Sequence, residues 1–434
     1  MKKIITLVLI GFCFLNKLQA QTKPDSAFEN KMKWFADAKL GIFIHWGIYA
    51  VDGVSESWSF YNGYMNHDDY MKQLNGFTAK NYNPQQWADL IKESGAKYAV
   101  LTAKHHDGVA LWNSKMGGIN VVKNAPAKKD VVQPFIDALR KNGLKAGLYF
   151  SLIDWSYNDY DCFVKNEKRY TSDSIRWSKF LNYYQGQLKE ISSQFNPDLY
   201  WFDGDWEHNA TEWQAEKVRA MLLEKNPNTI INSRLAGHGD YATPEQGVPV
   251  FKPKDKYWEL CLTINDSWGY QPHDHAYKSS GMILNILVDC ISKGGNLLLD
   301  IGPKPDGTID EKQVKVLKDL GRWTKKHSEA IYGTQAGVPL EYTNYPTALS
   351  ADSTTLFVYV NGIPDGNIYI KGLQNKIQRA RIVGNGAIVE TNVLGKAYWS
   401  EIPGILSVEV PADLCDEEIT VVALLLDGKI RLYK

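Results

Sequence analysis

The 434-residue sequence has few cysteines, only five, and none of them stands in a CxxC pair. A chain of this size with so few, widely spaced cysteines does not depend on disulfides, so we expect mostly buried thiols at Cys162, Cys261, Cys290 and Cys415. An excess of either charge is also missing, because 49 Lys and Arg residues balance 49 Asp and Glu residues. Without a net positive charge the protein has no long-range attraction for nucleic acid, and a nucleic-acid partner is disfavoured.

After residue 20 the sequence also lacks any uninterrupted apolar stretch of the roughly 18 residues that a membrane-spanning helix needs. The first twenty residues combine a basic start, an apolar run over residues 4–15 and a Leu-Gln-Ala ending. We therefore predict a signal peptide over residues 1–20 and export to the bacterial periplasm or the extracellular space, without membrane insertion after cleavage. The sequence predicts no particular oligomeric state.

Short, nearly continuous apolar runs alternate with helix-length segments between residues 40 and 302. Such runs are typical of parallel strands that are covered by helices on both faces. Seven runs come close to the eight strands of a TIM barrel, so we predict an α/β fold with a (β/α)8-like catalytic barrel over residues 21–338. The runs cover residues 40–45, 98–104, 145–151, 199–203, 229–232, 261–264 and 296–301.

The pattern changes after a last helical stretch at residues 311–331. Short alternating runs follow, broken by Gly, Pro, Asn and Asp, at residues 355–360, 367–371, 379–383, 405–410 and 419–426. No helix-length pattern occurs among them. We predict an antiparallel β-sandwich over residues 339–434.

Polar residues with catalytic potential follow several of the barrel runs. The first run ends in His45, the second leads into His105 and His106, the fourth ends in Asp203, and the fifth leads to Arg234. The carboxyl ends of the strands form the active face of a TIM barrel. One histidine at such a position would more often be structural, but their coincidence with Asp and Arg favours a functional site.

Asp203 ends a buried run and is followed by Gly204, which leaves room for a ligand to approach. The alternative is that Asp203 caps the following helix, as strand-to-helix loops often require. Because Asp205 and Glu207 are also available for capping, and crowding three carboxylates is costly, we favour a catalytic nucleophile.

Glycoside hydrolysis needs a second carboxyl group, which protonates the leaving oxygen. Two candidates occur in the sequence. Glu245 lies in a loop-like stretch, which suits an acid that reaches the leaving group from the side. Glu259 stands at the start of a strand, where it would face the other end of the barrel unless the strand is shifted.

These residues lie in motifs that together resemble the retaining α-L-fucosidases of glycoside hydrolase family 29. The resemblance spans roughly residues 27–335, with a matching β-sandwich after it. The motifs are GIFIHWG at residues 41–47, ESW at 56–58, HHDG at 105–108, WFDG at 201–204, WELC at 258–261, SWGY at 267–270 and KGGNLLLDIGP at 293–303.

The resemblance implies an exo-acting enzyme that releases terminal α-L-fucose from oligosaccharides or glycoconjugates, without a metal or other cofactor. Asp203 matches the family nucleophile. Glu245 fits the family's spacing for the acid/base between Arg234 and Trp268, and Glu259 stays the alternative. The residues matching those that hold the sugar are His45, Glu56, Trp58, His105, His106, Trp201 and Arg234, with Trp268 against the C5 methyl group. Trp46, together with Trp58, Trp201 and Trp268, is expected to form the apolar wall of the pocket.

Two other functions use similar residues. A catalytically inactive fucose-binding barrel would keep the tryptophans and lose a carboxylate, whereas both carboxylates are present here. A metal-dependent amidohydrolase also places His and Asp at barrel strand ends. Such enzymes usually have two His one residue apart on the first strand, and here Trp46 and Gly47 follow His45. We therefore favour the fucosidase over both alternatives.

Overall fold

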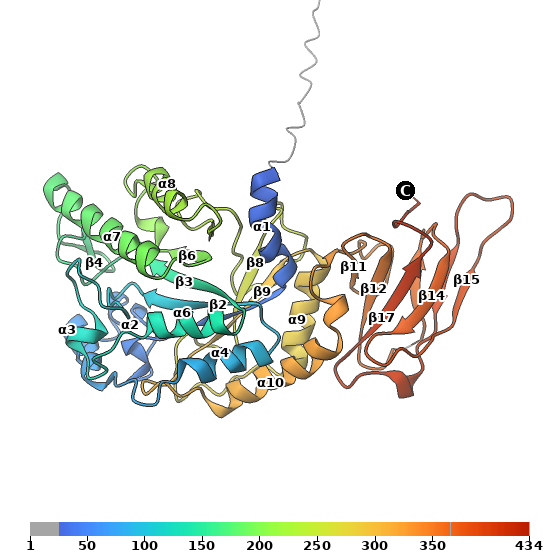
Figure 1. Cartoon of the computed structure of the whole chain (residues 1–434), viewed down its shortest axis with the longest axis horizontal. Coiled ribbons are helices and arrows are strands. Elements are labelled where there is room, and N and C mark those ends of the chain that lie inside the picture. Colours follow the sequence, from blue (N-terminus) through green and yellow to red (C-terminus); the bar gives the residue numbers. More distant parts are fainter. Residues whose placement is uncertain (1–25, 365, 434) are drawn as a thin grey trace, which may run out of the picture.

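The computed structural model describes residues 26–364 and 366–433. The predicted signal peptide lies outside these described residues. Within them, no helix is both long enough and apolar enough to cross a membrane. Figure 1 shows an α/β part beside a group of antiparallel strands, with helices α9 (Ser280–Ser292) and α10 (Glu311–Lys326) between the two.

Seven parallel strands form one curled sheet in the order β7-β6-β3-β2-β1-β9-β8. All seven predicted runs are strands of this sheet. Every residue of β1, β2, β8 and β9 is buried, which explains why these runs are mostly apolar. The strands are β1 (Leu40–Ile44), β2 (Tyr98–Lys104), β3 (Lys145–Ser151), β6 (Leu199–Asp203), β7 (Ile230–Ile231), β8 (Glu259–Thr263) and β9 (Asn296–Ile301).

An irregular stretch at residues 241–245 lies between β7 and β8. Tyr241 forms a parallel bridge with Asn232, which follows β7, and Glu245 forms one with Cys261 of β8. Pro244 has no N–H to donate, so a regular ladder is interrupted there. The stretch supplies the eighth position of the barrel, and the predicted (β/α)8-like fold is confirmed. Glu245 stands at its carboxyl end.

Helices connect the strands along the outside of the barrel (Figure 1). The predicted helices at 84–94, 131–142 and 174–195 are present as α4 (Pro84–Glu93), α6 (Val132–Lys141) and α7 (Ser174–Gln194). The predicted helix at 311–331 ends earlier, as α10, because the backbone of His327 leaves the helical conformation. Besides short 3₁₀ turns, the remaining described elements of this part are α1 (Ser26–Ala38), α2 (Trp58–Tyr61), α3 (His67–Met71), α5 (Val121–Asn124), α8 (Ala215–Lys225), and a hairpin of β4 (Cys162–Val164) and β5 (Glu167–Lys168).

Two antiparallel sheets follow α10 and enclose a second hydrophobic cluster between residues 338 and 426. The predicted C-terminal β-sandwich is thereby confirmed, whereas the domain boundary at residue 338 stays a prediction. One sheet has the order β10-β11-β12-β17-β14 and the other β13-β16-β15. Their strands are β10 (Gln335–Ala336), β11 (Thr347–Leu349), β12 (Thr355–Asn361), β17 (Ile419–Leu426), β14 (Ile377–Ile382), β13 (Ile368–Lys371), β16 (Ile405–Val408) and β15 (Thr391–Leu394).

The sandwich packs on the barrel through α10. The indole Nε1 of Trp323 donates a hydrogen bond to the carbonyl of Ile419 at 2.8 Å. Lys326 pairs with the buried Asp416 at 2.6 Å. A buried hydrogen bond and a charge pair with one buried partner, Asp416, therefore fix the two parts to each other.

The four cysteines that were expected to be mostly buried thiols are all unpaired. Cys261 and Cys290 are buried, as expected. Cys162 and Cys415 are only half-buried, because they lie in the β4–β5 hairpin and in a turn of the sandwich, outside the two cores.

Candidate active site

A cavity of about 350 Å³ lies at the carboxyl ends of the barrel strands. Its wall is made of residues in the carboxyl-terminal parts of β1, β3, β6 and the 241–245 stretch, and of residues that follow β1, β2, β6, β7 and β8. It brings together eight of the predicted site residues: His45, Trp58, His105, Trp201, Asp203, Arg234, Glu245 and Trp268. It also contains three that the sequence analysis missed: Phe43, Tyr149 and Trp206.

Arg234 contacts both predicted catalytic carboxylates. Its Nη1 donates to Oδ1 of Asp203 at 3.0 Å, and its Nη2 donates to Oε2 of Glu245 at 2.6 Å. The guanidinium lies over the ring of Trp201, 4.6 Å from the ring centroid. Burial alone would lower the pKa of Arg234, but the nearby carboxylates raise it above its usual value. A permanent cation therefore holds the two carboxylates at one side of the cavity.

Asp203 is held without being used as a helix cap. Its Oδ2 accepts a hydrogen bond from the hydroxyl of Tyr149 at 3.1 Å and lies 3.6 Å from Nε2 of His106. The short 3₁₀ turn that follows has Gly204 as its N-cap, with no side-chain cap bond. Gly204 has φ +84°, and a Cβ there would lie 2.8 Å from Ile153, so only glycine suits this turn. The capping alternative for Asp203 is thus wrong.

The three predicted histidines share one arrangement, in which Nδ1 is held and Nε2 is left for another partner. His45 Nδ1 lies 2.7 Å from Asp300, His105 Nδ1 lies 2.6 Å from Ser57, and His106 Nδ1 lies 2.6 Å from Ser151. Burial lowers the pKa of all three rings, that of His106 to about 3. They are therefore neutral near pH 7. Nε2 of His106 is buried and has no hydrogen-bond partner. A ligand hydroxyl group bound there would supply the missing hydrogen bond.

Aromatic rings form the rest of the wall. The Trp268 ring lies 5.0 Å from the His45 ring, and the Trp206 ring stacks on Trp58 with centroids 6.0 Å apart. Phe43 and Tyr149 lie two residues before His45 and Ser151 on their strands. Side chains two apart on a strand share a face, so this spacing was the signal that could have found them.

Glu56 lies behind the cavity wall. Its Oε1 accepts a hydrogen bond from the backbone N–H of Gly269 at 2.7 Å, next to Trp268. Burial raises the pKa of Glu56 to about 7. Glu56 therefore supports the loop that carries Trp268.

Glu259 lies deeper in the barrel interior and does not line the cavity. It accepts hydrogen bonds from the hydroxyl of Tyr98 at 2.5 Å and from Nε1 of Trp201 at 2.9 Å. Burial raises its pKa to about 7. Glu259 is the first residue of β8 and therefore lies on the side of the Trp201 ring that faces the amino end of the barrel. The Trp201 ring separates this alternative acid/base from Arg234 and the cavity.

The family model described as alpha-L-fucosidase matches residues 15–329. The chain belongs to the alpha-L-fucosidase family. An alpha-L-fucosidase of Branchiostoma floridae is 33% identical over 365 residues, which cover 76% of this chain and 79% of the relative. The structure of alpha-L-fucosidase isoenzyme 1 from Paenibacillus thiaminolyticus is 32% identical, with a TM-score of 0.84, and covers 93% of this chain and 100% of that chain.

A second solved structure bears on the chemistry of the alpha-L-fucosidase family. It is a trapped covalent intermediate of a family 29 alpha-L-fucosidase from Bacteroides thetaiotaomicron with 2-fluoro-fucosyl fluoride, obtained with a Glu-to-Gln mutant. It is 26% identical, has a TM-score of 0.81, and covers 92% of this chain and 96% of that chain. The resemblance inferred from the motifs is confirmed by these matches.

Trp46, unlike the other predicted site residues, packs outside the barrel interior. Its ring packs in the core against Phe77, Tyr82 and Trp87, and its Nε1 donates to the carbonyl of Lys304 at 2.9 Å. The physical reason is the alternation of side chains along an extended chain. His45 points into the barrel, so its neighbour points outward to α4.

Trp46→Ala should therefore lower stability without changing specificity. We expect the free energy of unfolding to fall by about 3 to 5 kcal/mol, as for other large-to-small changes of buried aromatic residues. The measurement is urea denaturation followed by circular dichroism, beside KM for 4-nitrophenyl α-L-fucoside at a temperature where the variant is folded. A large rise in KM in the folded variant would show that Trp46 contributes to sugar binding and would contradict this prediction.

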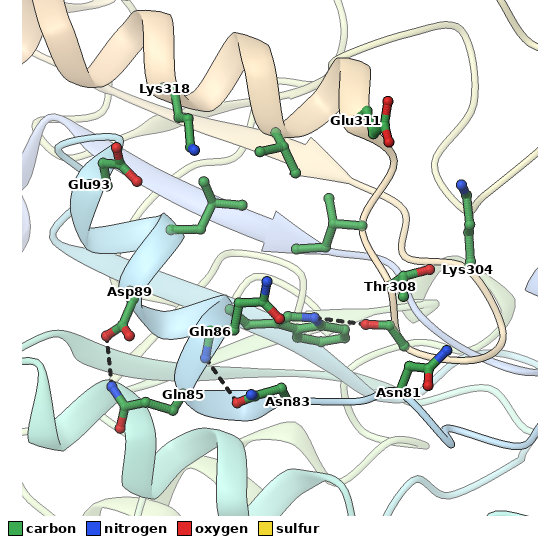
Figure 2. A pocket seen from close by; sticks show the side chains of 15 residues that line it. Asn81, Asn83, Gln85, Gln86, Asp89, Glu93, Lys304, Thr308, Glu311 and Lys318 are labelled. Carbon is green, nitrogen blue, oxygen red and sulfur yellow. Dashed lines mark hydrogen bonds between the residues drawn. The ribbon is translucent and has the colours of Figure 1, made fainter.

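A second cavity, of about 880 Å³, lies on the outside of the barrel between α4 and α10 (Figure 2). Amide and charged side chains surround it, and Nε1 of Trp87 donates to the carbonyl of Gly307 at its floor. None of the strand-end histidines or predicted catalytic carboxylates lines it. The predicted catalytic residues therefore make the smaller cavity the candidate active site.

Over residues 26–364 and 366–433, no group of three or more His, Cys, Asp or Glu side chains is arranged to hold a metal ion. The histidines at the strand ends instead contact hydroxyl and carboxyl groups through Nδ1.

Proposed function

We propose that this protein releases terminal α-L-fucose from glycans with retention of configuration, with Asp203 as the nucleophile and Glu245 as the general acid/base. One observation carries the proposal. A single guanidinium, that of Arg234, contacts both carboxylates at the mouth of a cavity walled by tryptophans and neutral histidines. Retaining glycosidases need such a pair about 5 to 5.5 Å apart.

In the first step, a carboxylate oxygen of Asp203 forms a bond to C1 of the fucose as the bond from C1 to the glycosidic oxygen breaks. Glu245 gives its proton to that oxygen, and the rest of the glycan leaves as an alcohol. In the second step, Glu245 takes a proton from water, whose oxygen attacks C1 and releases Asp203. Two inversions at C1 give net retention.

Fucose has ring hydroxyls and an apolar C5 methyl group, and the cavity offers a partner for each. The neutral rings of His45, His105 and His106 can donate to or accept from hydroxyl groups through Nε2. Trp268 supplies an apolar surface for the methyl group. The pocket is therefore suited to a deoxy sugar.

A catalytically inactive fucose-binding protein would need the aromatic rings and histidines but not a second carboxylate beside Arg234. The contact of Arg234 with both carboxylates disfavours that alternative. A metal-dependent amidohydrolase is disfavoured by family membership and by the histidine contacts described above.

We also propose that the protein acts outside the cytoplasm, in the periplasm or the medium, after removal of residues 1–20. The signal-like composition of these residues supports the proposal. Cell fractionation with N-terminal sequencing of the mature chain tests it. A cytoplasmic protein that keeps Met1 would overturn it.

The direct test of activity is hydrolysis of 4-nitrophenyl α-L-fucoside followed by proton NMR. We expect α-L-fucose as the first product, because double displacement retains configuration. We expect excess EDTA to leave kcat/KM unchanged, since both catalytic groups are carboxyl groups. First formation of β-L-fucose would show an inverting mechanism, and inactivation by EDTA that zinc reverses would favour the metal-dependent alternative.

A further inference from the structure

Exposure divides the wall of the active-site cavity into a floor and a rim. The floor consists of the buried side chains of Phe43, His45, His105, Tyr149 and Trp201. At the rim, Trp206 is 52% exposed and the side chain of Glu245 is 39% exposed. A general acid must contact the glycosidic oxygen, so the leaving group emerges beside Glu245 and next to the rim.

Trp206 is fixed in place although it is exposed. It lies in the 3₁₀ turn Asp205–Glu207, three residues after the nucleophile. Its ring stacks on Trp58, with planes 20° apart, and meets the edge of His106 at 5.6 Å. The adjacent Glu207 anchors the turn by accepting from Nε1 of Trp155 at 3.1 Å. One ring face is thus supported by protein, and the exposed half remains available to a ligand.

We propose that Trp206 forms the subsite for the leaving group and that the leaving group it selects is a pyranose sugar. This inference rests on the proposed function and adds to it the class of group to which the fucose is attached. A pyranose presents a face of C–H bonds that can cover the indole ring and remove apolar surface from water. A small leaving group cannot reach the ring and gains nothing from it.

The test compares two substrates that share the fucose and differ in the leaving group: α-L-fucosyl-(1→2)-D-galactose and α-L-fucosyl fluoride. The measured quantity is the ratio of kcat/KM for the disaccharide to kcat/KM for the fluoride. We expect this ratio to fall about tenfold in Trp206→Ala and to recover in large part in Trp206→Phe, whose ring can still stack.

The matched control is Trp399→Ala, which removes a 76% exposed tryptophan from the sandwich, outside the cavity. We expect its ratio to equal that of the unchanged protein. If Trp206→Ala does not fold by circular dichroism, Trp206→Leu replaces it, because leucine keeps apolar volume without a ring.

An unchanged ratio in the folded Trp206 variant would overturn the inference. An equal loss on both substrates would overturn it too, because Trp206 would then serve the fucose itself. If the unchanged protein hydrolyses neither substrate, the proposed function fails, and that result is distinct from turnover of both with an insensitive ratio.

Discussion

Replacing Asp203 with Ala will lower kcat for 4-nitrophenyl α-L-fucoside by roughly 10⁴- to 10⁶-fold, because the carboxylate that forms the covalent bond is lost. Neither neighbour that donates to it can take over. Arg234 is a cation, and burial raises the pKa of Tyr149 well above its usual value, so its phenol stays protonated. Steady-state release of 4-nitrophenolate measures the loss.

Azide distinguishes a missing nucleophile from a damaged site. In Asp203→Ala, azide can occupy the space of the carboxylate and attack C1 while 4-nitrophenolate leaves. A single displacement gives β-L-fucosyl azide, the inverted product, and partial recovery of turnover. If azide neither restores turnover nor yields this product, Asp203 does not act as the nucleophile.

The matched control is Asp198→Ala. Asp198 precedes the same strand, β6, at its amino end, and its Oδ2 accepts from the backbone N–H of Ala146 at 3.0 Å. It is a partly buried carboxylate at the amino end of the barrel, whereas the cavity lies at the carboxyl end. We expect kcat for this variant to stay within about threefold of the unchanged protein, since stability and not chemistry depends on it.

The sequence predicts the barrel strands well because strands such as β2 and β9 are buried on both faces, and this burial selects nearly continuous runs of apolar residues. The 241–245 stretch has no continuous apolar run. Its pairing depends on contacts with Asn232 and Cys261, and Pro244 breaks any regular pattern. Glu245 was therefore predicted as a loop residue, although it ends the eighth position of the barrel.

The candidate site could be predicted in part, for reasons that depend on distance along the chain. His45 and Asp203 are visible because polar residues that close apolar runs are unusual. The partners that orient the histidines are not visible, because Asp300 is 255 residues from His45 and nothing local links the two. The pocket role predicted for Trp46 is wrong because Trp46 directly follows His45 on an extended chain, and successive side chains point to opposite faces.

Replacing Glu245 with Ala will have an effect that depends on the leaving group. For a fucosyl disaccharide, whose sugar alcohol needs a proton to leave, we expect kcat/KM to fall by about 10² to 10⁴-fold. For α-L-fucosyl fluoride or a dinitrophenyl fucoside, which leave without protonation, kcat/KM should change much less, while kcat falls because water is no longer deprotonated. Azide should then speed the second step and give α-L-fucosyl azide, the retained product.

Glu259→Gln separates the two glutamates. Glu259 contacts Tyr98 and Trp201 and no group of the cavity rim, so it can act on the reaction only by positioning the Trp201 ring below Arg234. Its removal should change kcat/KM by a similar factor for every leaving group, and azide should restore nothing. If the loss of kcat/KM depended on the acidity of the leaving group in Glu259→Gln but not in Glu245→Ala, Glu259 and not Glu245 would be the acid/base. Because the azide products of Asp203→Ala and Glu245→Ala differ in configuration at C1, the same reagent identifies both carboxylates.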